Sequence, residues 1–133
     1  MTMNQRSLRR ARRLFANVHS TGELSDSVLE QALVVDTVAG SVVVTGCAHP
    51  DIVEIADTAR GYLGNDLRLL MGGFHLIGRH PDEVRATIDA LRRLGVRSVA
   101  PSHCTGGEAI AMFRAVWRDE FIDSGCGAVI DVP

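Results

Sequence analysis

Three short apolar runs in this chain each end in a turn that contains a histidine, and this repeat constrains the fold more than any other feature. The turns are Gly46-Cys47-Ala48-His49-Pro50, Gly72-Gly73-Phe74-His75-Leu76 and Pro101-Ser102-His103-Cys104-Thr105-Gly106. Each apolar run is typical of a buried strand, and the start of a predicted helix follows each turn. Strands that alternate with helices through short loops predict an α/β layered sheet. All three turns then lie at carboxyl ends of strands, where open α/β sheets bind ligands.

The remaining pattern supports this α/β sheet. Two β-branched runs, Gln31–Thr37 and Ser41–Thr45, flank a short turn with Gly40, which predicts a β-hairpin. Apolar stripes at helical spacing predict a helix after each histidine turn. Pro50 is expected at the first position of the first helix, and Thr105 with Glu108 fits a capping box at the start of the last.

The two ends of the chain carry weaker signals. Residues 1–16 are polar and arginine-rich, which is compatible with a short helix, and residues 17–28 are predicted to be a loop. Gly127–Val132 is predicted to form a closing strand. We therefore divide the chain into an arginine-rich N-terminal segment, residues 1–16, and one partial domain, residues 17–133.

Composition narrows the class of protein. The chain has 133 residues, 46% of them hydrophobic and 23% charged, which is ordinary for one globular domain. No apolar run approaches the roughly 20 residues that span a bilayer, and the start lacks a signal-peptide core. We therefore expect a cytoplasmic protein without a membrane partner. The absence of lysine excludes a Schiff-base or P-loop lysine. An odd number of cysteines without a signal peptide argues against a disulfide framework, and the lack of a CxxC argues against a Cys-rich structural zinc site.

The first 19 residues contain arginines and no acidic residue. A basic arm that binds nucleic acid or a membrane is one interpretation of this stretch. A solvated segment is the other, and we favour it because no aromatic residues interleave with the arginines to stack on bases. Nucleic acid is therefore not an expected partner.

The chemistry of the site depends on the three histidines taken together. Each one alone is also compatible with a capping or buried histidine. Three imidazoles at one sheet edge predict a metal site, since neutral imidazole is the commonest ligand at catalytic zinc. His49, His75 and His103 are the predicted ligands of one Zn²⁺ or similar divalent ion, and the chemistry implied is metal-activated water or Lewis-acid polarisation.

The cysteines in the same turns allow further interpretations. Cys47 is two residues from His49, so it is either an additional ligand or a small buried residue. Cys104 follows His103 directly, and the two side chains are expected to diverge. A nucleophilic Cys–His pair that uses Cys47 or Cys104 is a further alternative.

At these turns the sequence resembles the metallo-β-lactamase-fold hydrolases. More narrowly, it is similar to the C-terminal half of the branch of 7,8-dihydropterin-6-methyl-4-(β-D-ribofuranosyl)aminobenzene-5′-phosphate synthase-like proteins. The resemblance rests on the three turns, on Glu30–Val35 and on Ser20-Thr21-Gly22, and it covers roughly residues 17–132. It implies half of an αββα sandwich, in which a β-hairpin precedes alternating helices and strands.

The same resemblance implies roles for the histidines. His49 matches the third metal-ligand motif of the family, and His103 matches the last one. His75 stands where many relatives have a bridging aspartate, so the resemblance implies either a metal ligand or a catalytic contact to substrate or proton. The implied substrate is a small molecule, phosphorylated or pterin-like.

The sequence departs from the family in one large respect. The principal HxHxDH metal motif is absent from these 133 residues. We therefore expect a truncated or half-domain form that needs a complementing segment, and apolar residues of the Val34–Val44 hairpin exposed on the sheet. Such a surface implies self-association or a complementing subunit. The leading hypothesis is a metal-dependent hydrolase-like protein, and the alternative is a non-catalytic remnant that acts as a binding or assembly module.

Overall fold

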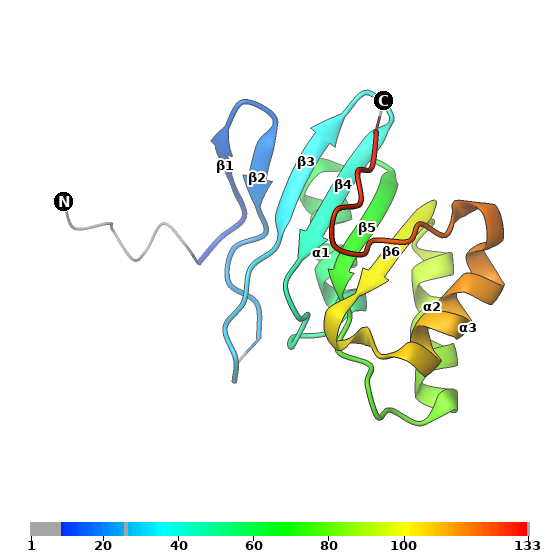
Figure 1. The fold of residues 1–133 in the computed structure, drawn as a ribbon. Helices are drawn as coiled ribbons and strands as arrows, with labels where there is room; N and C mark the ends of the chain where they lie inside the picture. Colours follow the sequence, from blue (N-terminus) through cyan, green and yellow to red (C-terminus); the bar gives the residue numbers. More distant parts are fainter. Residues whose placement is uncertain (1–8, 26, 133) are drawn as a thin grey trace.

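The structure is a computed structural model that describes residues 9–25 and 27–132. Its described part forms a mixed α/β fold with one six-stranded sheet, whose strands lie in the order β1-β2-β3-β4-β5-β6 (Figure 1). The strands are β1 (Arg12–Phe15), β2 (Val18–Ser20), β3 (Leu33–Thr37), β4 (Gly40–Thr45), β5 (Leu67–Gly73) and β6 (Ser98–Ser102). The helices are α1 (Ile52–Leu63), α2 (Pro81–Arg93) and α3 (Gly107–Trp117), with the short 3₁₀ turns η2 (His103–Thr105) and η3 (Arg118–Glu120).

The sheet changes from antiparallel to parallel at β4. Strands β1 to β4 pair antiparallel, and the predicted hairpin is confirmed as β3 and β4, with Val34 opposite Val43. Strands β4, β5 and β6 are parallel and are connected through α1 and α2. The carboxyl ends of these three strands therefore lie at one edge of the sheet. One histidine turn follows each strand at this edge.

The main core lies between the sheet and the three helices. Alternate strand residues face the helices, as the period of two in a strand requires. Val34, Val43, Leu70 and Val99 are fully buried there and belong to one cluster with side chains of α1, α2 and α3. Phe113 of α3 packs edge-on against Phe74 at 5.4 Å between ring centroids, which ties the helical layer to the end of β5.

The opposite face of the sheet is covered by the C-terminal segment. Figure 1 shows this segment crossing in front of the strands after η3. Its Ile122, Ile130 and Val132 pack against a second core cluster of Val42, Leu69 and Ala100. The Ile122 backbone N–H donates to the carbonyl of Val99 at 2.8 Å, and the hydroxyl of Ser124 donates to the carbonyl of Ala100 at 3.1 Å.

Two expectations about this part of the fold are wrong. Gly127–Val132 forms no strand, because the segment lies across the sheet face instead of pairing at its edge. The hairpin is not broadly exposed either, since Val34, Val42 and Val43 are 0–7% exposed. Within the hairpin, Val38 at the turn is exposed. The other large exposed apolar side chains include residues of β1, of the loop before β3 and of the first position of β3: Leu14, Phe15, Val28, Leu29 and Leu33.

The N-terminal part also differs from its prediction. Arg12–Phe15 and Val18–Ser20 are strands that pair as a hairpin, where a short helix and a loop were expected. All four residues of β1 are exposed, so the segment has no apolar alternation from which a strand could be predicted. Residues 1–8 of the predicted segment lie outside the described residues.

Two helix starts correct the predicted capping. The Asp51 side chain accepts from the backbone N–H of Val53 at 2.7 Å, so Asp51 is the cap of α1 and Pro50 precedes it. The predicted capping box at Thr105 is wrong, because this buried hydroxyl donates to the carbonyl of Ser102 and accepts from the backbone N–H of Phe74. Thr105 therefore joins the ends of β5 and β6 instead of starting α3.

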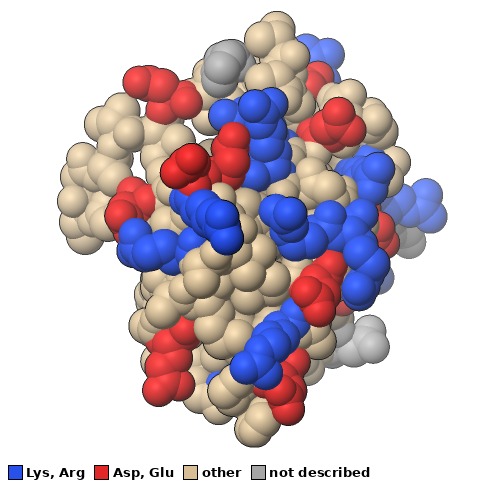
Figure 2. Space-filling view, turned by 90° about the vertical axis from the view of Figure 1, so that its right-hand side faces the viewer, with Lys and Arg blue, Asp and Glu red and all other residues tan. Residues whose placement is uncertain are grey.

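The surface over the helical side carries both signs of charge. Figure 2 shows arginines and acidic side chains interspersed on this face, without an extended patch of one sign. Arg85 with Asp82 and Arg114 with Asp123 are examples of the ion pairs, each at 2.7 Å. Among the described helices, none is long and apolar enough to cross a membrane.

Candidate metal centre at the strand ends

The three histidine turns share an unusual backbone conformation. Ala48, His75 and His103 have φ angles of 57°, 52° and 52°. A positive φ in a residue other than glycine costs of order 1–3 kcal/mol and persists only where the surrounding structure imposes it. One such residue in each turn indicates that the surrounding structure imposes these backbone conformations. Residues of this kind are common at functional sites.

Two glycines at the end of β5 allow the turns to approach each other. Gly72 has a φ of 121°, a conformation that glycine adopts readily. A Cβ on Gly73 would lie 2.5 Å from the carbonyl oxygen of Gly46 and 2.7 Å from the Sγ of Cys104. The end of β5 is thus held closely between the turn after β4 and the turn after β6.

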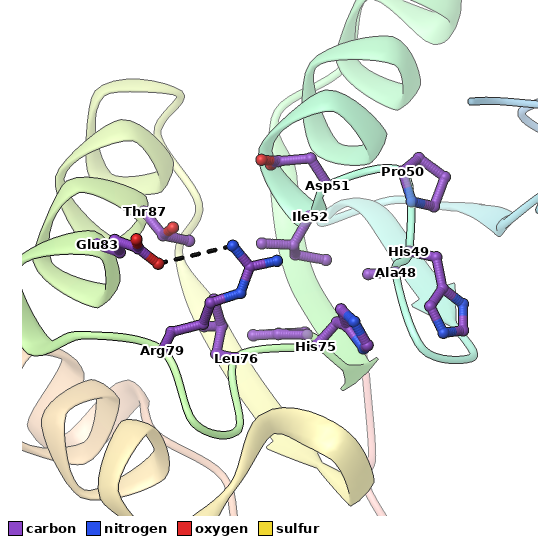
Figure 3. A pocket seen from close by; sticks show the side chains of 11 residues that line it. Ala48, His49, Pro50, Asp51, Ile52, His75, Leu76, Arg79, Glu83 and Thr87 are labelled. Atoms are coloured by element: carbon purple, nitrogen blue, oxygen red, sulfur yellow. Dashed lines mark ion pairs between the residues drawn. The ribbon is translucent and has the colours of Figure 1, made fainter. Parts of the chain in front are cut away.

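His49 and His75 lie side by side in a pocket at this edge (Figure 3). Their ring centroids are 4.5 Å apart, and the ring planes are tilted by 54°. The pocket has a volume of about 110 Å³ and is also lined by Arg79 and Glu83, whose side chains form an ion pair at 3.6 Å. Two imidazoles and a guanidinium therefore face the same small space.

Glu30 holds His49 in place. The backbone N–H of His49 donates to Oε2 of Glu30 at 3.1 Å, and the Nδ1 of the His49 ring bonds to Oε1 of the same carboxylate. With the carboxylate as acceptor, the neutral form of the His49 ring has its proton on Nδ1 and its lone pair on Nε2. A carboxylate on the second ring nitrogen is the usual support of a metal-binding histidine.

The His75 ring has a free binding atom. Its Nδ1 is buried and has no hydrogen-bond partner in the described structure. Buried polar atoms are normally satisfied, so an orphaned one points to a missing water, ligand or ion. A lone pair on an imidazole nitrogen beside a carboxylate-supported second imidazole suits a divalent ion, and the residues present therefore fit a metal.

His103 lies in a different group of ligand atoms. The ligand atoms of Cys47, His103 and Cys104 are all within 4.8 Å of one another. Among the described residues, the three histidines do not form such a group. The structure thus brings His49 to His75 and His103 to the two cysteines, and a single ion bound by all three histidines stays a prediction.

The two cysteines also interact with each other. The thiol of Cys104 donates to the carbonyl of Cys47 at 3.4 Å, and both cysteines are free and half-buried. The hydrogen bond to Cys104, together with burial, raises the pKa of the Cys47 thiol. The expected divergence of the His103 and Cys104 side chains is wrong, because the ligand atoms of both lie in this cluster.

Sequence reasoning did not assign roles to two residues of the site. Glu30 is separated by 19 residues from His49, and only the fold brings them together. Arg79 lies in the loop before α2, and its place in the pocket depends on the path of that loop. The only sequence signal for Glu30 was its position just before the β3 strand, in the segment that resembles the family.

Comparison with known proteins places the chain among described proteins. No family model matches the chain. Over 102 residues, or 76% of this chain, it is 35% identical to 7,8-dihydropterin-6-methyl-4-(beta-D-ribofuranosyl)-aminobenzene-5′-phosphate synthase of Methanocaldococcus jannaschii. It also resembles the crystal structure of Tm1679, a metal-dependent hydrolase of the β-lactamase superfamily, with a TM-score of 0.86 and 28% identity over 92% of this chain.

The chain spans only part of each of these proteins. The match covers 35% of the archaeal synthase and 56% of the hydrolase chain. Within that span, sequence and fold agree with the resemblance that the three turns indicated. The chain is therefore related to the metallo-β-lactamase-fold hydrolases and is similar in sequence to a dihydropterin-phosphate synthase, the branch that its turns indicated.

Proposed function

We propose that this chain carries the strand-end part of the metal centre of a metal-dependent hydrolase-type protein. The observation that carries the proposal is the His49–His75 pair, with Glu30 on one ring and an orphaned nitrogen on the other. The structural relative is described as a metal-dependent hydrolase, which supports the same reading.

The proposed ligands are His49, His75 and His103, and the proposed ion is Zn²⁺ or a similar divalent metal. When bound, such an ion activates a water molecule or polarises a carbonyl or phosphoryl oxygen. Glu30 keeps the proton of His49 on Nδ1, which leaves Nε2 to bind. The orphaned Nδ1 of His75 is available to bind the ion or, in the alternative role, to hold a proton at the substrate.

The proposed substrate is a small phosphorylated or pterin-like molecule. The name of the archaeal relative contains both chemical groups. In this chain, Arg79 places a guanidinium in the histidine pocket, where its partner is the exposed carboxylate of Glu83. Because a guanidinium binds phosphate in a bidentate manner, a phosphate group is able to replace that carboxylate.

We further propose that full activity needs a complementing segment or subunit. The histidine pocket has about 110 Å³, whereas small-molecule sites generally have at least ~300 Å³. The rest of the substrate-binding surface would then come from the part of the relatives that this chain does not span. Light scattering across a concentration series tests self-association, and a strictly monomeric protein at high concentration contradicts that version.

The test of the metal centre is metal analysis of the purified protein. We expect stoichiometric divalent metal in the wild type and its loss in a His49→Ala/His103→Ala double variant. His80→Asn is the matched control, because His80 is exposed and caps α2 through its side chain, a role that asparagine also performs. Metal retained by the double variant, or lost in the control, contradicts the proposed ligands.

A second candidate function is a non-catalytic binding or assembly module. The observation that favours it is the separation of His103 from the group formed by the other two histidines. This candidate predicts that the folded protein holds no stoichiometric metal. The same metal analysis therefore distinguishes the two functions.

A further inference from the structure

Two cysteines and a histidine from two separate turns converge beside the histidine pocket. Cys47 follows β4, whereas His103 and Cys104 belong to η2 after β6. Their ligand atoms lie within 4.8 Å of one another, although 56 residues separate Cys47 from His103 in the sequence. Neither cysteine is in a disulfide.

The backbone positions these side chains. Gly73 leaves room for the Cys104 sulfur, since a Cβ there would lie 2.7 Å from it and 3.2 Å from the Cα of Cys47. The hydrogen bond from Cys104 to the Cys47 carbonyl links the two turns. The ring of His103, a residue with a φ of 52°, belongs to the same group. The space at Gly73 and the hydrogen bond from Cys104 therefore allow the two turns to lie close together.

We propose that Cys47, Cys104 and His103 form a thiolate–imidazole site for a thiophilic divalent cation of the zinc class. Zinc binds thiolate at about 2.3 Å and imidazole at about 2.0–2.1 Å, so neighbouring ligands of a tetrahedral site are roughly 3.4–3.8 Å apart. The ligand atoms of the observed group all lie within 4.8 Å of one another, so the side chains would draw together to bind the ion. Soft sulfur ligands select zinc-like ions over magnesium, calcium or manganese.

The site has an open position and an entry path. Two thiolates and one imidazole leave a fourth tetrahedral position for water or substrate, which is the arrangement of catalytic zinc sites with three protein ligands. Cys47 and Cys104 are half-buried and His103 is exposed, so a cation reaches the site from solvent. Binding converts both thiols to thiolates and releases their protons to water.

This inference rests on the proposed function only in that both assign His103 to a metal. In the proposed function, His103 joins the imidazoles of His49 and His75. Here its partners are the two thiols, which makes the strand-end centre sulfur-containing and restricts the metal it selects.

Cobalt titration tests the proposal, because thiolate ligands of Co²⁺ give a charge-transfer absorption that imidazole ligands do not give. The protein is stripped of metal with a chelator and kept reduced, and thiol titration verifies that its cysteines are free. We expect the absorption to saturate at one equivalent of Co²⁺ in the wild type. Cys47→Ser and Cys104→Ser should each lower this absorption and bind Co²⁺ at least about tenfold more weakly, and the Cys47→Ser/Cys104→Ser double variant should lose the absorption.

Two control variants make the assignment specific. Cys126→Ser removes an exposed cysteine outside the group and should leave the absorption unchanged. His103→Ala should keep the thiolate absorption with weaker binding. Circular dichroism of each variant establishes that the protein is folded.

The outcomes separate this inference from the proposed function. Co²⁺ binding that requires His49 and His75 but shows no thiolate absorption overturns the inference and leaves the proposed function standing. Thiolate absorption that survives in a His49→Ala/His75→Ala variant supports the inference and contradicts the histidine ligand set. Absence of any Co²⁺ binding by the reduced, folded wild type overturns both.

Discussion

Replacing Gly73 with alanine tests whether the close approach of the three turns is as tight as the structure indicates. The new Cβ would lie 2.5 Å from the Gly46 carbonyl oxygen and 2.7 Å from the Cys104 sulfur. Ordinary contact begins at 3.4 Å, so the turns must separate by as much as about 0.9 Å. That movement also weakens the 2.9 Å hydrogen bond from the Gly73 N–H to the same oxygen.

The expected loss is large for a single methyl group. Overpacking costs typically ~1–3 kcal/mol and a lost hydrogen bond about 0.5–1.5 kcal/mol, so Gly73→Ala should lower the free energy of unfolding by roughly 2–4 kcal/mol. For a chain of this length, the corresponding fall in Tm is roughly 7–14 °C. Denaturant unfolding and differential scanning calorimetry measure both quantities.

Gly61→Ala is the matched control, and its expected effect has the opposite sign. Gly61 is an exposed residue inside α1, and a Cβ there meets nothing within 4 Å. Alanine is a better helix former than glycine, so this change should stabilise the protein by about 0.5–1 kcal/mol. A Gly73→Ala protein as stable as the wild type would refute the reasoning, because the turns would then not be in the close contact described.

Three further changes have definite expected outcomes. Glu30→Gln should weaken Co²⁺ binding at His49 by about 10–100-fold, measured by titration, and unchanged affinity would show that the carboxylate does not support the ligand. Phe113→Ala, at a fully buried side chain, should cost about 3–5 kcal/mol in denaturant unfolding, and a loss below ~1 kcal/mol would contradict the packing of α3 on the sheet. The hydrogen bond from Ser98, with Arg97 and Arg68 nearby, lowers the pKa of Glu120. The ionised Glu120 therefore stabilises the folded protein above the unfolded pKa of about 4.3, and this stabilisation is lost as the pH falls through the lower pKa of the folded state. Glu120→Gln should therefore reduce the dependence of unfolding free energy on pH below about pH 4, and an identical pH profile would contradict this contribution.

The parallel half of the fold could be predicted from the sequence because its signals are local. Strand, glycine-containing turn and helix stripe recur within short distances, and the β3–β4 hairpin has a clear turn at Gly40. The N-terminal hairpin could not be predicted, because β1 is exposed along its length and lacks an apolar face. Its strand conformation depends on pairing with β2, which is a tertiary effect.

The candidate site was predictable in its location but not in its internal grouping. The carboxyl ends of parallel strands meet at one edge, so topology alone brings His49, His75 and His103 to the same region. Which ring meets which ligand depends on local backbone angles, such as the positive φ of His75 and His103. Those angles have no signature in a residue that is not glycine, and the cysteines therefore could not be paired with His103 in advance.

The two glycines before His75 show the same limit on a smaller scale. From the sequence alone, either glycine could provide an unusual φ or a close approach of the backbone. The structure divides these roles, with Gly72 at a φ of 121° and Gly73 in close contact with both neighbouring turns. Only the fold distinguishes the two positions.

The left-handed backbone at His75 and His103 has a consequence for directed evolution. Glycine adopts this conformation without the steric cost that a histidine meets there, so selection for thermal tolerance alone should favour His75→Gly and His103→Gly. Such variants would gain thermal stability but would lack the imidazole side chain. If both histidines are retained when activity is also selected, their retention measures how much thermal stability the protein loses by keeping these two rings.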